Sequence, residues 1–173
     1  MEKKSTFLLS MQFGLLTGIV MAVFSLVLFL AGVDMHSYWN LFSYVLFVAG
    51  LYWGMVNVRE KRLEGVISYG KAFGTGFWIT VFAAVVLGIF AYFYLKDINP
   101  GVLSDALTKA QDKIVSSNPD ISDEDLQKAL DMVKIFTTPA MSAVSQFFSN
   151  LVFGTIFSLI IAIFAKREDR TLA

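Results

Sequence analysis

The sequence predicts an all-α integral membrane protein, a four-helix bundle with a small extracytoplasmic helical hairpin between spans three and four. Only 16% of the residues are charged, whereas a soluble domain has about a quarter. Because a membrane-spanning helix needs about 20 apolar residues, four stretches without any charge are each long enough to hold one. These stretches are bounded by Lys4 and Asp34, Asp34 and Arg59, Lys71 and Lys96, and Lys134 and Lys166.

The boundaries of the segments follow from the positions of the charges along the chain. Residues 1–12 form a polar N-terminal segment, and the apolar run after it predicts the first span at 13–32. The apolar core of a secretory signal is only about 7–15 residues long, so we expect this helix to be retained. The remaining segments are a second span at 39–58, a basic loop at 59–71, a third span at 72–95, a polar insert at 96–138, a fourth span at 139–165 and a tail at 166–173.

The distribution of Lys and Arg predicts the orientation, because positively charged flanks are retained in the cytoplasm. The N-terminal segment, the basic loop and the tail contain two, four and three of these residues, and the connection at 34–38 has none. The insert has five Lys against eight acidic residues. We therefore expect a multi-pass inner-membrane protein with both termini in the cytoplasm and the insert in the periplasm. The basic residues expected to contact lipid headgroups are Arg59, Lys61, Arg62, Lys71, Lys166 and Arg167.

The polar insert predicts two helices joined by a short turn. Asn99 precedes Pro100, which is typical of a helix start with a capping side chain. After the chain-breaking residues 116–119, Ser122 and Asp125 form a capping-box pattern. Each helix carries an apolar stripe, which includes Leu126, Leu130, Val133 and Phe136 in the second helix.

Small residues recur at four-residue spacing and predict close packing between helices, because that spacing places them on one helical face. The same pattern serves a bundle formed by one chain and a homodimer equally well. The predicted packing residues are Gly14, Gly18, Gly50, Gly54, Gly74, Gly88, Gly154 and Ser158.

A polar cluster in the fourth span has two interpretations. Gln146, Ser149 and Asn150 lie within about one helical turn and are costly to expose to lipid. Hydrogen bonds to another helix, worth about 0.6–2 kcal/mol each, are the favoured interpretation. The alternative is a polar path for a solute.

Several kinds of chemistry lack the residues that they need. The chain has no cysteine and a single histidine, His36, which we expect to be solvated in the connection after the first span. No Asp, Glu, Lys or Arg lies within the four predicted spans, although proton-coupled carriers usually place such a group there. The net charge of zero gives no basic field for nucleic acid.

Two segments resemble ligand-binding loops but depart from them. Residues 65–71 resemble a phosphate-binding loop, yet Ala72 occupies the position of the hydroxyl residue that would hold magnesium. The acidic residues at 120–125 lack the glycine and the closing glutamate of a calcium loop. We therefore expect no metal, no cofactor, no catalytic residues and no enzymatic activity.

Residues 64–79, EGVISYGKAFGTGFWI, resemble the hallmark segment of a membrane-protein family of the bacteroidete lineage, catalogued as domain of unknown function 4199. The resemblance extends to the early Gly14 and Gly18, the acidic insert, and the AIFAKR sequence at 162–167. It implies a bacterial inner-membrane protein with four spans. It implies no activity and no catalytic residues.

Taken together, these features predict a non-catalytic membrane protein that associates with a membrane-protein partner, with the lipid bilayer or with a second copy of itself, through the outer hairpin. The alternative is an oligomeric channel or facilitator for a small uncharged solute, whose uncharged lining would be Gln146, Ser149 and Asn150.

Overall fold

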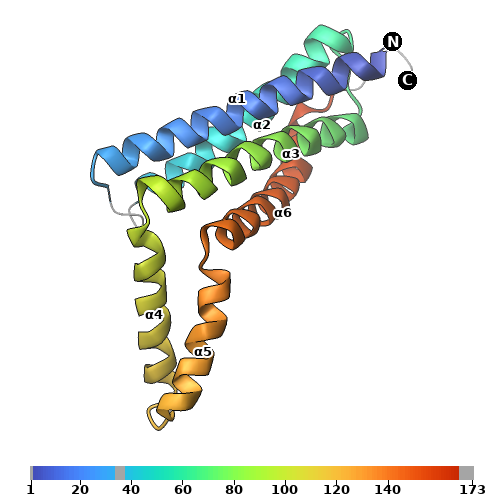
Figure 1. The fold of residues 1–173 in the computed structure, drawn as a ribbon. Coiled ribbons are helices and arrows are strands. Elements are labelled where there is room, and N and C mark those ends of the chain that lie inside the picture. The colour runs from blue at the N-terminus through green and yellow to red at the C-terminus, as the bar shows by residue number, and fades with distance from the viewer. Residues whose placement is uncertain (1, 34–37, 168–173) are drawn as a thin grey trace. The chain divides into compact units, whose positions relative to one another are not determined.

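The computed structural model describes residues 2–33 and 38–167, which are helical almost throughout (Figure 1). They form α1 (Glu2–Leu30), α2 (Trp39–Arg62), α3 (Tyr69–Phe93), α4 (Gly101–Ser117), α5 (Asp123–Phe136) and α6 (Pro139–Ala165). A π-helical turn at Tyr94–Ile98 continues α3. Four helices are long and apolar enough to cross a membrane, and they are α1, α2, α3 with its π-helical turn, and α6. The predicted all-α fold class is therefore confirmed. Asp34 and His36 lie outside the described residues.

Three of the long helices extend beyond the apolar runs that predicted them. α1 begins at Glu2 rather than near residue 13, α2 continues to Arg62, and α3 begins at Tyr69. A helix continues through polar residues until the backbone conformation changes, and apolarity marks only the part that a bilayer can cover. After the end of α2, the backbone conformation changes at Glu64 and Gly65, whose φ angles of 53° and 83° lie in the left-handed region. α6 spans the predicted 139–165.

The chain divides into two compact units, each described here by itself. The first consists of Met1–Leu87 and Phe147–Ala173, and so holds α1, α2, most of α3 and most of α6. The second is Gly88–Gln146, which holds the end of α3, the π-helical turn, α4, α5 and the first residues of α6.

The core of the first unit lies where α2, α3 and α6 meet. Leu51 and Met55 of α2 and Ile79 of α3 are completely buried. Thr80 of α3 and Ser158 of α6 are also completely buried, and their hydroxyl oxygens share a hydrogen bond of 3.3 Å. The two hydroxyls satisfy each other between the helices, as a membrane interior without water requires.

Gly14 and Gly18 allow α1 to lie directly against α3. A Cβ atom added at Gly14 would lie 2.6 Å from the Ile79 carbonyl oxygen and 2.7 Å from the Cβ atom of Phe82. A Cβ atom added at Gly18 would lie 2.7 Å from the Cβ atom of Val86. These distances are too short for any side chain, so the pair of glycines sets the approach of the two helices.

The other predicted packing residues differ in what surrounds them. A Cβ atom added at Gly50 would meet Thr17, and one added at Gly54 would meet Phe13 and Ile79. At Gly154 it would meet Thr80 and Phe47. Gly88 is buried. Gly76, which the four-residue spacing missed, faces Met55 and Ser158.

Gly74 makes no close contact with another helix within the described part of the chain. A Cβ atom there would meet nothing within 4 Å, because this side of α3 borders open space. The residue follows the spacing of the small-residue pattern, yet it borders a groove rather than a packed helix.

Candidate functional site

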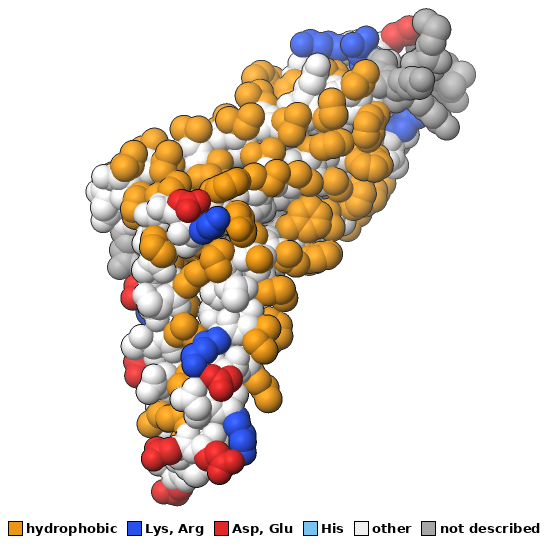
Figure 2. All heavy atoms as spheres, viewed as in Figure 1, with side chains coloured by type: hydrophobic (Ala, Val, Ile, Leu, Met, Phe, Trp, Pro, Cys, Tyr) orange, Lys and Arg blue, Asp and Glu red, His pale blue; other side chains and the backbone are white. Residues whose placement is uncertain are grey.

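The ends of α2 and α6 and the start of α3 meet at one end of the first unit, which we call the basic end. It contains the six predicted headgroup residues, Arg59, Lys61, Arg62, Lys71, Lys166 and Arg167. All of them are exposed except Arg59, which is half-buried. Figure 2 shows Lys and Arg side chains beside a broad apolar surface over the long helices. Basic side chains next to an apolar surface are typical of the ends of membrane-spanning helices.

The basic end is held together by contacts that reach far along the chain. The Arg59 guanidinium donates a hydrogen bond of 2.9 Å to the carbonyl oxygen of Ala165, the last residue of α6. Ile67 and Arg167 exchange two backbone hydrogen bonds of 2.9 Å in an isolated antiparallel bridge. The Tyr69 hydroxyl donates to the Leu159 carbonyl oxygen at 3.2 Å.

These contacts satisfy the end of α6 through two devices that act together. The last carbonyl groups of a helix have no partners within it, and a positive charge near them is favourable. Arg59 supplies both a hydrogen-bond donor and a positive charge. Ile67 is only 1% exposed and packs in the core, so it fixes the position of the bridge. Arg59 and the segment between α2 and α3 therefore hold the end of α6 in place, and we call these contacts the clasp.

A groove between α1 and α3 opens at the basic end. Its volume is about 380 Å³, and its lining residues are Thr6, Phe7, Ser10, Leu63, Lys71, Gly74, Thr75 and Trp78. Two hydroxyl residues at its floor are nearly inaccessible, and each donates to a carbonyl of its own helix, Ser10 to Thr6 at 3.0 Å and Thr75 to Lys71 at 2.8 Å. Phe7 and Trp78 pack edge to face, with ring centroids 5.0 Å apart.

The groove combines one cation with an apolar wall. Lys71 is exposed, and within the described part of the chain it makes no ion pair and no side-chain hydrogen bond. Sequence reasoning predicted the headgroup contact of Lys71 but not the groove beside it. The four-residue spacing of Ser10, Gly14 and Gly18 was a signal that this face of α1 continues toward α3.

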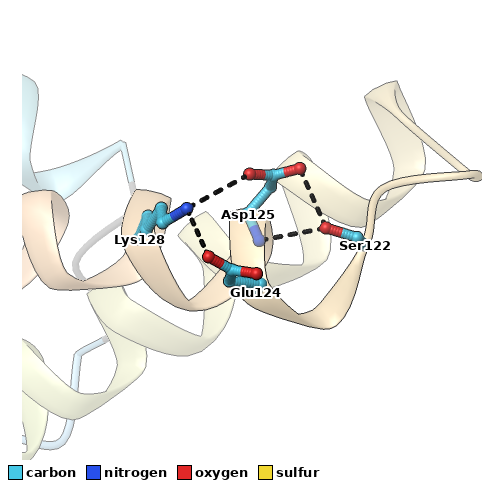
Figure 3. Close-up of polar contacts among 4 residues, drawn as sticks. All are labelled: Ser122, Glu124, Asp125 and Lys128. Atoms are coloured by element: carbon cyan, nitrogen blue, oxygen red, sulfur yellow. Dashed lines mark hydrogen bonds and ion pairs between the residues drawn. The ribbon is translucent and has the colours of Figure 1, made fainter.

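In the second unit, the predicted helix start at Ser122 is confirmed. The Ser122 hydroxyl accepts a hydrogen bond from the Asp125 backbone N–H at 3.2 Å and lies 2.8 Å from its carboxylate (Figure 3). Lys128 bridges to Glu124 at 2.7 Å one turn later. The predicted cap at Asn99 is wrong, because α4 begins after Pro100 without a side-chain cap and the Asn99 amide instead donates to the Tyr94 hydroxyl at 3.3 Å.

The two amphipathic helices of the hairpin leave one apolar patch uncovered. The side chains of the predicted stripes are half-buried, and no residue of α4 or α5 is fully buried. Phe136, expected in the second stripe, is instead 63% exposed, together with Met132 at 66% and Ile135 at 61%. We call these three residues the α5 patch. It occupies one helical face just before α6 begins at Pro139.

The rest of the α5 surface is strongly polar. Asp123, Glu124 and Asp125 occupy its first turn, where the helix dipole favours negative charge. Hydrogen bonds from Lys134 and Gln127 hold the pKa of the Asp131 carboxyl below its usual value. The α5 patch is therefore surrounded by charged and polar groups.

The three polar residues of the fourth span differ in exposure. Gln146 and Ser149 are exposed, and Asn150 is half-buried. Among the described residues, the Asn150 side-chain nitrogen is buried without a hydrogen-bond partner. Within the described residues, none of these side chains has a hydrogen bond to another helix, so the choice between bonds to a helix of a second molecule and a polar path stays open.

The two loop-like segments differ in structure from the ligand-binding loops that they resemble. The described residues contain no group of three His, Asp or Glu side chains placed to hold a metal. The segment at 65–71 is preceded by α2 rather than by a strand, and its Gly70 and Lys71 already belong to α3. It therefore differs from a phosphate-binding loop in its backbone as well as at Ala72.

The family model described as Protein of unknown function (DUF4199) matches residues 12–167. The chain belongs to this family. The match to DUF4199 includes both residues of the Ile67–Arg167 bridge, the groove residues from Leu63 onward, and the whole hairpin. No curated protein and no solved structure matches the chain.

Proposed function

We propose that the protein is a non-catalytic inner-membrane protein that acts by binding a second membrane protein through its periplasmic hairpin. The observation that carries the proposal is the α5 patch, in which three large apolar side chains are more than half exposed on an otherwise charged helix. Exposed apolar clusters with a polar rim are typical of protein contact surfaces. The absence of charged side chains from the four spans supports a role without proton-coupled transport.

The charge of the hairpin favours a protein partner over bare lipid. The segment at 96–138 has five Lys and eight acidic residues, so its net charge is −3. Anionic membrane surfaces attract basic segments, and an acidic one is repelled from them. A second copy of this chain would bring two acidic hairpins together, which is also unfavourable. The surface that fits is an apolar patch with a basic rim on a different protein.

The α5 patch lies close to the start of α6, which favours a partner at the membrane boundary. Phe136 lies three residues before Pro139, the first residue of α6. At a rise of about 1.5 Å per helical residue, the patch lies within about 10 Å of the start of the span. A partner that covers it must itself reach the outer surface of the membrane, as a membrane protein does.

Photo-crosslinking in native membranes tests this proposal. We expect a photoreactive residue at Ile135 to give a discrete adduct with another protein, and the same residue at Glu124, exposed in the charged first turn, to give none. The triple variant Met132→Gln, Ile135→Gln, Phe136→Gln should lose the corresponding complex on native gels, while Lys128→Gln should retain it. Adducts with lipid alone, a dimer of this chain, or equal protein adducts from both positions would contradict the proposal.

A further inference from the structure

We infer that the groove between α1 and α3 at the basic end is a binding site for one anionic phospholipid. Its phosphate would pair with Lys71, and an acyl chain would pass over Gly74 along Phe7 and Trp78. This site is independent of the hairpin contact proposed above.

The electrostatics of the groove select a negatively charged headgroup. Lys71 has no ion-pair partner among the described residues, and none of the eight lining residues is acidic. Basic pockets between membrane helices are a recognised way of holding anionic headgroups.

The shape of the groove selects a lipid over a small anion. About 380 Å³ is within the range of small-molecule sites and is far larger than a phosphate ion needs. Gly74 has no neighbour that a Cβ atom would meet within 4 Å, so the groove is open along α3 at this position. A free phosphate would use only Lys71 and would leave the rest of the groove empty.

The wall beyond Gly74 is suited to an acyl chain. Trp78 is 42% exposed and Phe7 is 38% exposed, and both rings also pack against Phe82. Along α3, Trp78 lies seven residues beyond Lys71 in the same helix, which corresponds to about 10 Å of depth. That is the separation expected between a headgroup phosphate and the first part of a chain below it.

The hydroxyl groups of Ser10 and Thr75 do not make the floor of the groove polar. Both hydroxyls donate to carbonyl groups of their own helices, at 3.0 Å and 2.8 Å, so neither donor is left facing the groove. The floor can be covered by hydrocarbon without leaving an unsatisfied donor. Lys71 alone then supplies the charge that decides which lipid is held.

Native mass spectrometry of the full-length protein, with phosphatidylglycerol as the probe, tests this inference. We expect one tightly retained phosphatidylglycerol. Lys71→Gln should weaken its binding about fivefold, the effect of one lysine at a charged lipid surface. Gly74→Leu should abolish binding by filling the groove, and its added Cβ atom meets nothing within 4 Å. Lys61→Gln, which removes an exposed charge outside the groove, should bind as the unaltered protein does.

Two further measurements separate the possible ligands. Phosphatidylcholine should compete weakly, and inorganic phosphate at millimolar concentration should not displace the bound lipid. The inference is overturned if Lys71→Gln and Gly74→Leu both retain the lipid, if Lys61→Gln loses it to the same extent, or if inorganic phosphate displaces it. Circular dichroism and elution volume confirm that each variant is folded before its lipid is counted.

Discussion

Replacing Gly14 by alanine should lower the free energy of unfolding by about 1–3 kcal/mol, the usual cost of overfilling a packed interior. The added methyl group would lie 2.6 Å from the Ile79 carbonyl oxygen, which belongs to the α3 backbone and cannot rotate away. The Cβ atom of Phe82 at 2.7 Å is equally fixed to its helix. Relief requires α1 and α3 to move apart along the whole contact that Gly18 continues. Titration with a denaturing detergent, followed by circular dichroism, measures the effect.

Gly74→Ala is the matched control, because it makes the same change on α3 where a Cβ atom meets nothing within 4 Å. Alanine is favoured over glycine in a helix by about 1 kcal/mol, so this variant should be neutral or more stable. Gly14→Ala should therefore lower the stability, whereas Gly74→Ala should not. Equal shifts would mean that the approach of α1 to α3 does not depend on Gly14.

Replacing Arg59 by methionine should also destabilise the bundle, by about 1.5–3 kcal/mol, the usual contribution of a hydrogen bond to a charged group. Methionine keeps much of the side-chain length but cannot donate to the Ala165 carbonyl oxygen, which accepts from Arg59 at 2.9 Å. The Arg59 side chain is only 15% exposed, so water cannot easily replace it. We expect the loss to appear first as fraying of the last turn of α6, measured by hydrogen exchange at residues 162–165.

Arg62→Met controls for the loss of a positive charge at the same end of α2. Arg62 is exposed, and among the described residues it makes no ion pair. Its replacement should leave both the stability and the exchange of α6 nearly unchanged. The clasp described for Arg59 would be wrong if the two variants behaved alike.

The long helices could be predicted from the sequence because a bilayer imposes a simple requirement on length and apolarity. The fourth span is predicted at 139–165 from the charge-free run that Lys166 ends, and α6 has the same bounds. The predicted first span begins eleven residues after the start of α1, because the sequence gives no signal there. Polar residues such as Lys3 and Gln12 give no apolar signal, yet nothing in them ends a helix.

Local hydrogen bonding in the hairpin was predictable only where a side chain acts on its own helix. Ser122 and Asp125 are three residues apart, so their contact depends on nothing else in the fold. Asn99 has two options, the start of α4 and the Tyr94 hydroxyl before it, and the structure uses the second. The sequence does not indicate which of two nearby partners an amide will bind.

The groove and the clasp could not be predicted because their parts meet only after folding. Ile67 and Arg167 are a hundred residues apart, and nothing in either segment indicates the other. The segment at 64–79, singled out by its resemblance to a family, proves to contain Ile67 of the clasp and four residues of the groove, from Lys71 to Trp78. Gly74 shows the converse limit, since the spacing that indicates packing does not tell which face of α3 is occupied.

If the four long apolar helices cross the membrane, the loop between α2 and α3 and the hairpin between α3 and α6 lie on opposite sides of it. Because the chain has no cysteine, single cysteines report the two sides without background. Ser68 and Ser117 are both exposed, one in each segment. In spheroplasts, Ser117→Cys should react with a membrane-impermeant maleimide and Ser68→Cys should react only after permeabilisation. Reaction of Ser68→Cys in intact spheroplasts, or protection of Ser117→Cys there, would contradict the account.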